Sequence, residues 1–288
     1  MHDYEHDYEH DCEHDYETVL YREEHRVAWV TLNRPDSNNA FNSVMQAELK
    51  AIWQSLRKNP DVGCVVLTGA GDTAFCTGID RSEVTWEGFE DPSRRPEGMP
   101  GFGLNPFTYD SVDPNIGPKE NGLWTPVIIA ANGMACGGAF YLLGQAEFVI
   151  AADHATFFDP HITYGMTSAF ESIHLLQKMP FQEIMRIALM GGYERMSAER
   201  AREIGLVSEV VGADALHDTA AWAAERIASQ PPLAVTATVR ALWMGLELSR
   251  QQALGLAPLV LRIGSDRETL VAGQAAFTDH QRPEYRTR

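Results

Sequence analysis

The hydrophobic and polar positions along the chain first follow the two-residue period of strands and then the spacing of an amphipathic helix. Residues 18–23 and 27–32 alternate apolar and polar side chains around a short polar pair, which predicts a β-hairpin. After a strand-breaking Arg-Pro pair, Asn42 or Ser43 is placed to cap a helix that runs to about Lys58. The apolar residues of this helix recur on one face, so it is expected to pack against the sheet.

Short apolar runs separated by loops predict further strands in the middle of the chain. They lie at 64–68, 127–131, 148–151 and 156–158. A Gly-rich turn and a short apolar helix at 139–143 follow the second run. Residues 85–122 are rich in Gly, Pro and charge and have almost no periodicity. A loop of this length inside a compact domain is either functional or disordered.

Helical spacing dominates the rest of the chain. Helices are expected at 169–179, 181–190, 197–204, 214–229 and 233–269. Gly245, Gly255 and Pro258 are expected to break the last of these regions into pieces. Strands that alternate with helices and then give way to helices alone predict an α/β fold, with a stacked-sheet core over 18–212 and a helical region over 213–288.

The beginning of the chain has a different character. Residues 2–17 are four copies of a tetrapeptide, HDYE three times and HDCE once. Because few of these residues are apolar, residues 1–17 are predicted to form a disordered tail. Its histidines and carboxylates could bind a transition metal weakly, whereas a tandem duplication at a tolerant terminus needs no function. No metal site is expected in the rest of the chain.

Composition excludes several classes of function. The 288 residues carry a formal net charge of −17, which argues against a nucleic-acid partner because phosphate binding needs basic patches. With no apolar stretch of about eighteen residues and no apolar leader, neither a membrane span nor a secretory signal is expected. The cysteines have no paired spacing, which predicts reduced thiols in a cytoplasmic protein rather than disulfides or a zinc site. They are Cys12, Cys64, Cys76 and Cys136.

Five segments carry a further pattern. They are VAWVTLNRPDSNNAF (Val27–Phe41), TAFCTGID (Thr73–Asp80), VIIAANGMACGGAFYLL (Val127–Leu143), ATFFDPHITYGM (Ala155–Met166) and MSAERAREIGLVSEVV (Met196–Val211). In this order they resemble the crotonase (enoyl-CoA hydratase/isomerase) superfamily, over roughly residues 18–269. The resemblance implies a stacked-sheet ββα core and C-terminal helices that assemble a homotrimer or a dimer of trimers. It also implies an acyl-CoA substrate, whose coenzyme A replaces any separate cofactor.

The chemistry of such a site centres on a thioester oxygen that becomes negative when the α-carbon loses a substituent. Two fixed backbone N–H donors stabilise this oxygen without reorganisation, and one donor is typically worth on the order of 100-fold or more in rate. The Gly137-Gly138 pair before an apolar helix offers one donor, and glycine permits close approach of a ligand. By the resemblance, the two donors are the N–H groups of Ile79 and Gly138.

The same resemblance places the coenzyme A arm and the acyl group along these segments. The residues expected beside them are Arg34, Ala40, Ala74, Gly78, Asp80, Met134 and Gly137. Two interpretations of Arg34 stay open: it lies near the phosphates, or it braces its own loop.

Hydratases of this family hold one water between two glutamates, and both positions differ in this chain. They correspond to Tyr141 and His161. An imidazole titrates near neutral pH, so His161 is the candidate general base, and Tyr141 can donate a hydrogen bond or a proton. Glu171 is expected to orient His161, with Asp159 as the second choice. The opposing interpretation is a retired site in which His161 is a buried, satisfied histidine.

Three functions follow from these residues. The leading one is an enoyl-CoA hydratase/isomerase-like enzyme that forms an enolate and uses His161 as base. The His-containing corner also resembles relatives that hydrolyse a carbon–carbon bond, so the second is a hydrolase of a β-diketone or a β-ketoacyl-CoA. The third is a non-catalytic CoA-binding or scaffold protein. A catalytic thiol at Cys76 or Cys136 is less favoured, since no base is adjacent in the sequence.

The aperiodic segment 85–122 is expected to form a wall of the acyl pocket. Its aromatic content indicates a bulky or cyclic acyl group. The residues concerned are Trp86, Phe89, Phe102, Phe107, Tyr109 and, just after the segment, Trp124.

Overall fold

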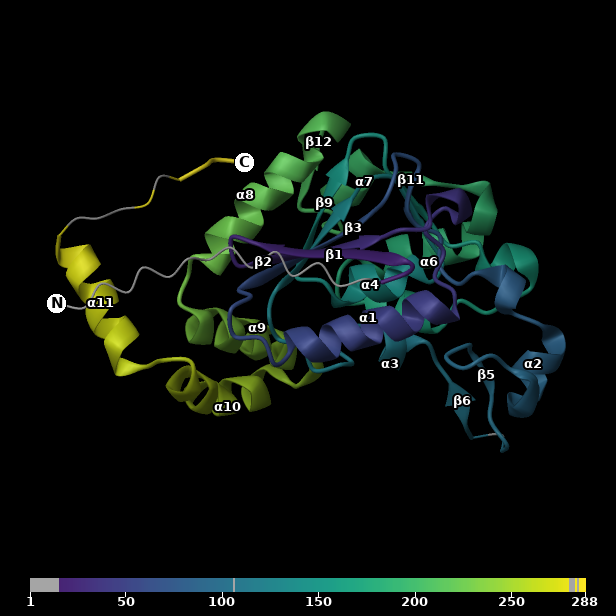
Figure 1. The fold of residues 1–288 in the computed structure, drawn as a ribbon, viewed down its shortest axis with the longest axis horizontal. Helices are drawn as coiled ribbons and strands as arrows, with labels where there is room; N and C mark the ends of the chain where they lie inside the picture. Colours follow the sequence, from purple (N-terminus) through teal and green to yellow (C-terminus); the bar gives the residue numbers. More distant parts are fainter. Residues whose placement is uncertain (1–15, 106, 280–282, 284) are drawn as a thin grey trace.

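A six-stranded sheet forms the centre of the protein (Figure 1). The computed structural model describes residues 16–105, 107–279, 283 and 285–288, so the predicted tail over 1–17 lies almost entirely outside the described residues. The strand order is β1-β2-β3-β7-β9-β12, with β1 and β2 antiparallel and the other neighbours parallel. The strands are β1 Val19–Glu24, β2 Val27–Leu32, β3 Cys64–Gly69, β7 Val127–Ala131, β9 Phe148–Ala152 and β12 Glu209–Val211.

A smaller sheet with the order β11-β10-β8-β4 lies beside the first. Its strands are β4 Ala74–Cys76, β8 Met134–Cys136, β10 Thr156–Phe158 and β11 Met196–Ser197. Side chains of both sheets share one buried cluster, in which Phe75 and Phe157 pack with Val65 of the larger sheet. The predicted stacked-sheet α/β fold is therefore confirmed.

Helices cover the remaining faces of the sheets. The predicted start of the first helix is confirmed, because the Asn42 side chain accepts a hydrogen bond from Met45 N at 2.9 Å. On the opposite face of the six-stranded sheet, Ala220 and Ala224 of α8 pack against Trp29. The helices of the core are α1 Ser43–Leu56, α4 Ala139–Gln145, α5 Phe170–Leu175, α6 Phe181–Met190, α7 Ala198–Glu203 and α8 Leu216–Ala228.

The segment 85–122 contains more regular structure than its sequence predicts. It forms α2 Trp86–Glu90, β5 Gly101–Phe102, β6 Tyr109–Asp110 and α3 Asp113–Ile116. Each element is too short to show a period in the sequence. The start of α2 is fixed by a cap, in which the Thr85 side chain accepts a hydrogen bond from Gly88 N at 3.0 Å. In Figure 1 α2 and the β5–β6 hairpin project from one end of the molecule.

Three helices follow the core, α9 Pro232–Glu247, α10 Arg250–Ile263 and α11 Arg267–Thr278, and lie at the other end (Figure 1). The expected breaks at Gly245, Gly255 and Pro258 are wrong, because all three residues lie inside α9 or α10. Instead, α10 and α11 begin directly after Ser249 and Asp266, whose side chains cap them. Within the described residues, no helix is both long and apolar enough to cross a membrane. The division at residue 212 stays a prediction.

Candidate active site

Two loops meet where the parallel strands β4 and β8 end. Because the strands pair in parallel, their carboxyl ends deliver residues 77–80 and 137–138 to the same edge. The contact is so close that a Cβ atom added at Gly78 would lie 2.6 Å from Gly138 N. Phe41 fixes the first loop, since Phe41 N donates to Gly78 O at 2.8 Å and Asp80 N donates to Phe41 O at 3.0 Å.

Two backbone N–H groups are available at this edge. Among the described residues, neither Ile79 N nor Gly138 N donates a hydrogen bond to a protein acceptor. Gly138 precedes α4, and Gly137 before it has a φ of +54°, a left-handed value that favours glycine. Buried donors without a partner are rare, so these two groups are suited to bind an anionic oxygen.

His161 lies between two carboxylates. Its Nδ1 contacts Asp159 Oδ1 in a short hydrogen bond, and its Nε2 lies 3.4 Å from Glu171 Oε1. Asp159 follows β10 and its side chain is fully buried, whereas Glu171 is in the first turn of α5. Both carboxylates expected to orient His161 therefore contact the ring: Asp159 at Nδ1 and Glu171 at the opposite ring nitrogen.

The imidazole and the two-loop edge are neighbours. A Cβ atom added at Gly137 would lie 3.5 Å from His161 Cε1, an ordinary van der Waals contact. Tyr141, one turn into α4, is buried and interacts with the Glu171 carboxylate. The structure thus brings together the three expected acid–base residues, Tyr141, His161 and Glu171, beside Gly137 and Gly138.

Burial and charge set the protonation of this group. Burial lowers the pKa of His161, but the hydrogen bond to Asp159 and the negative charge of Glu171 outweigh it, so the pKa rises above its ordinary value. Burial raises the pKa of Glu171, and His161 offsets this only in part. Burial and the charge of Glu171 also raise the pKa of Tyr141, which keeps its hydroxyl protonated. The pKa values of His161 and Glu171 are therefore both shifted toward the protonated forms.

Asp159 is the main group that raises the pKa of His161. Burial alone would raise the pKa of Asp159, but hydrogen bonds from His161 and Ser168 bring it below its usual range. Sequence reasoning missed Ser168 and Ser172, whose hydroxyl oxygens lie 2.5 Å apart and extend the network to α5. Serines are common at helix starts for capping alone, so their spacing carried no signal for this role.

The pH dependence of this network gives a first prediction. Asp159→Asn removes the charge that faces Nδ1, so the pKa of His161 should fall, measured by an NMR titration of its ring protons. The native pKa lies above the unfolded value of about 6.5. The stabilisation from His161 is therefore complete below about pH 6.5 and is lost as pH rises through the native pKa. In Asp159→Asn the melting temperature measured by thermal unfolding should therefore fall less over this pH range than in the wild type.

A matched control is Asp153→Asn, because Asp153 contacts an exposed histidine, His154, at 3.5 Å. It should leave the titration of His161 in place. An unchanged pKa of His161 in Asp159→Asn would contradict the assignment of Asp159.

The residues expected beside coenzyme A divide into two groups. Arg34 braces its loop, since its guanidinium pairs with Asp80 at 2.8 Å and donates to Ala40 O at 2.6 Å. These three residues, with Gly78 and Gly137, border the two-loop edge. Ala74 and Met134 pair with each other at the opposite ends of β4 and β8. Ala74 is also buried, so the structure places it away from the edge.

The cysteines at the ends of β4 and β8 are not suited to act as nucleophiles. Cys76 and Cys136 are buried, and burial raises the pKa of each thiol to about 12. A thiol with such a pKa is almost entirely protonated at neutral pH, and the thiolate is the reactive form.

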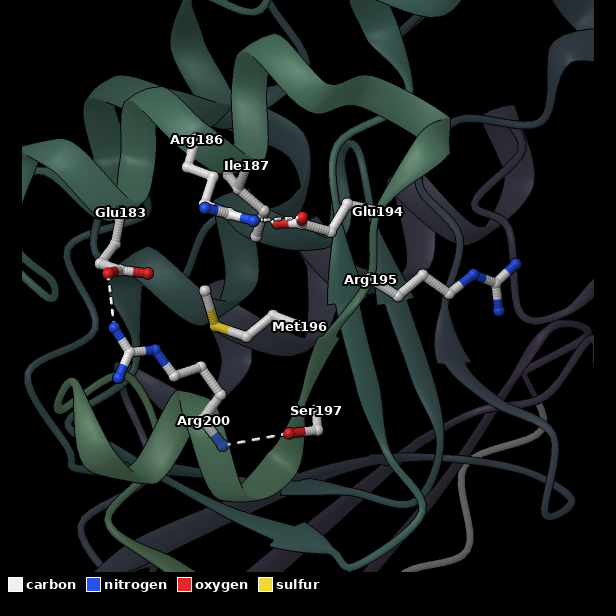
Figure 2. Close-up of a pocket in the computed structure, with 8 residues that line it drawn as sticks. All are labelled: Glu183, Arg186, Ile187, Glu194, Arg195, Met196, Ser197 and Arg200. Atoms are coloured by element: carbon white, nitrogen blue, oxygen red, sulfur yellow. Dashed lines mark hydrogen bonds and ion pairs between the residues drawn. The ribbon is translucent and has the colours of Figure 1, made fainter.

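A cavity of about 310 Å³ lies elsewhere, between α6 and the β11–α7 segment (Figure 2). Arg186 pairs with Glu194 and Arg200 with Glu183, each at 2.6 Å, so these charges already neutralise one another. None of the expected site residues lines this cavity.

Comparison with known proteins identifies relatives of the whole chain. The family model for enoyl-CoA hydratase/isomerase matches residues 22–98 and 121–288. An (E)-benzylidenesuccinyl-CoA hydratase of Thauera aromatica is 32% identical, over 91% of this chain and 96% of the relative. A short-chain-enoyl-CoA hydratase of Clostridium acetobutylicum is 30% identical, over 82% of this chain and 85% of the relative. An enoyl-CoA hydratase/isomerase structure from Mycobacterium paratuberculosis superposes with a TM-score of 0.83 at 33% identity, over 95% of this chain and all of that one.

Proposed function

The chain belongs to the enoyl-CoA hydratase/isomerase family of enzymes, which act on coenzyme A thioesters, and from this membership we propose that it adds water to an α,β-unsaturated acyl-CoA, or removes it, through an enolate. The observation that carries the proposal is the contact between two kinds of group. Among the described residues the N–H donors of Ile79 and Gly138 have no protein acceptor, and the His161 ring, which pairs with Glu171, lies against Gly137 of the same edge.

In this proposal the thioester oxygen accepts hydrogen bonds from the two N–H groups. His161 Nε2 takes a proton from water, whose oxygen bonds to the β-carbon, and the electrons of the double bond move to the thioester oxygen as an enolate. Glu171 then donates its proton to the α-carbon, and the enolate collapses to the thioester. Burial raises the pKa of Glu171, which favours the protonated form that this step needs.

The two proton carriers restore each other after the reaction. His161 is then an imidazolium and Glu171 a carboxylate, 3.4 Å apart, so the proton can pass directly between them. Tyr141 keeps its proton throughout and supports the Glu171 carboxylate. This pair takes the place that two glutamates hold in other hydratases of the family, and the reaction uses no cofactor besides the coenzyme A of the substrate.

A second function is favoured by one observation. The C–C hydrolases that this corner resembles carry an acid on the following helix, at the position of Phe170 in this chain. Glu171 lies one residue later, yet its carboxylate is 3.4 Å from His161 Nε2. With the same base, water would attack a ketone carbonyl and the enolate would leave as the carbon–carbon bond breaks. A hydrolase of this kind would cleave a β-ketoacyl-CoA or a β-diketone and would not hydrate crotonyl-CoA.

The test titrates the purified protein with acetoacetyl-CoA, follows the absorbance of the bound enolate, and assays hydration of crotonyl-CoA. An enolate signal with hydration supports the proposal. An enolate signal with cleavage of the β-ketoacyl-CoA and no hydration supports the hydrolase. If neither thioester binds or reacts, the hydration proposal is refuted, and a β-diketone hydrolase or a scaffold role is left.

We further propose a homotrimer or a dimer of trimers. No residue of α10 or α11 is buried, and their apolar side chains include Leu259 and Leu261, which are 58% and 70% exposed. Exposed apolar surface of this kind marks an interface with another chain. Light scattering should give three or six times the chain mass of 32.0 kDa, and Leu259→Glu with Leu261→Glu should lower it. A wild-type monomer would contradict the proposal. A cytoplasmic location and the lack of a nucleic-acid partner stay predictions from the sequence.

A further inference from the structure

A segment between the two loops of the candidate site, residues 77–80 and 137–138, is held in a fixed position. Residues 99–120 lie outside the match to the family, yet they contain the β5–β6 hairpin. The guanidinium of Arg95, nearly buried, pairs with Asp110 and donates to Phe102 O at 3.4 Å across the hairpin. A Cβ atom at Gly101 would lie 1.9 Å from Arg95 Nη1, so the Arg95 guanidinium fits here only because residue 101 is glycine.

Four rings of the hairpin and its neighbours form one aromatic cluster, Phe89, Phe102, Tyr109 and Phe170. The centroid of Phe102 lies 5.1 Å from that of Phe89 and 5.7 Å from that of Tyr109, both edge-on. Tyr109 stacks on Phe170 at 5.3 Å with 16° between the ring planes. The cluster therefore joins the hairpin to α5, the helix that carries Glu171.

The cluster borders the proton-transfer pair. Phe170 directly precedes Glu171, and burial together with the charge of Glu171 raises the pKa of Tyr109. A water activated by His161 reaches only a β-carbon that lies beside this pair. Because the stacked rings of Tyr109 and Phe170 border this pair, we place the substituent on that carbon against them.

The cluster is also incomplete. Phe102 is 50% exposed, Tyr109 37% and Phe170 38%, so large parts of three rings are uncovered. Stacked and edge-on ring pairs gain more than the burial of their area, and an alkyl chain cannot supply that gain. We propose that this aromatic cluster selects acyl-CoA thioesters with an aryl ring on the β-carbon. The inference rests on the hydration proposed above and names its substrate class.

The experiment compares two dehydrations that release water and form a conjugated thioester. The probes are 3-hydroxy-3-phenylpropanoyl-CoA, which gives cinnamoyl-CoA, and 3-hydroxybutanoyl-CoA, which gives crotonyl-CoA. We expect the wild-type kcat/KM to favour the phenyl substrate by about ten-fold or more. Tyr109→Leu should lower this preference about three- to ten-fold, and Tyr109→Phe, which keeps the ring, should hold it within about two-fold. Phe107→Leu is the matched control, because Phe107 is in the same hairpin turn and is 96% exposed.

A wild-type enzyme without aryl preference would overturn the inference, and so would an unchanged preference in Tyr109→Leu. The acetoacetyl-CoA enolate signal separates failure of the substrate class from failure of the proposed reaction. If the enolate forms and both 3-hydroxyacyl-CoA probes are dehydrated without aryl preference, only the substrate class is wrong. If no enolate forms and neither probe is dehydrated, the proposed reaction is wrong as well. A retained enolate signal in Tyr109→Leu also shows that the variant is folded.

Discussion

Replacing His161 with alanine is expected to lower kcat for crotonyl-CoA hydration by about 1000-fold, within the range typical for loss of a general acid–base group. The acetoacetyl-CoA enolate signal should persist, because its donors, Ile79 N and Gly138 N, belong to other loops. The variant should also lose the pH dependence that the His161 titration gives to turnover. Stopped assays over a pH series, run beside the enolate titration, measure both effects.

His154→Ala is the matched control, since His154 is exposed, with Nε2 against the backbone oxygen of Asp72 and Nδ1 near the carboxylate of Asp153. It should change kcat by less than about two-fold. Loss of the enolate signal together with turnover in His161→Ala would mean that the histidine is structural. Full activity in that variant would exclude it as the base.

Gly78→Ala is expected to lower kcat/KM by roughly 100- to 1000-fold and to abolish the enolate signal. The added Cβ would lie 2.6 Å from Gly138 N, at the donor itself, so one of the two hydrogen bonds to the oxyanion is blocked or displaced. Loss of a single such donor has an effect of this size. The substitution adds backbone strain as well, because φ at Gly78 is +83°.

Gly205→Ala separates strain from blockage. Gly205 has a similar φ of +91°, and its nearest neighbour to an added Cβ is Lys178 O at an ordinary 3.8 Å. It should lower the free energy of unfolding by a comparable amount and leave the enolate signal intact. Equal loss of the signal in both variants would show that instability, rather than the contact with Gly138, causes the effect.

Much of the fold could be predicted because its longer elements have a clear period. The hairpin of β1 and β2, the capped α1 and the apolar strands β7 and β9 follow the expected boundaries closely. The three-residue strands β4 and β8 lie in segments whose glycines and polar residues predicted a loop and a turn. The breaks in the C-terminal helices were misplaced: α10 and α11 follow the capping residues Ser249 and Asp266, and Pro258 lies inside α10.

The site was predictable in its members but less so in its geometry. His161 and Tyr141 were selected from the family pattern and Glu171 from its place at the start of the next helix, and the fold brings the three together. Which carboxylate meets which ring nitrogen depends on the turn after β10, where Asp159 folds back on a residue two positions later. No periodicity encodes that turn, so the order of Asp159 and Glu171 around the imidazole emerged only from the structure.

The pairing of β4 with β8 has a consequence for how such an enzyme can diversify. The ladder sets the spacing of the loops that carry Ile79 and Gly138, although the β5–β6 hairpin and its flanking residues lie between them in sequence. Insertions there lengthen a connection without shifting the strands that it joins, and longer loops cost little additional entropy. The hairpin that we propose as the selector of the substrate can therefore be exchanged without moving the proposed oxyanion donors.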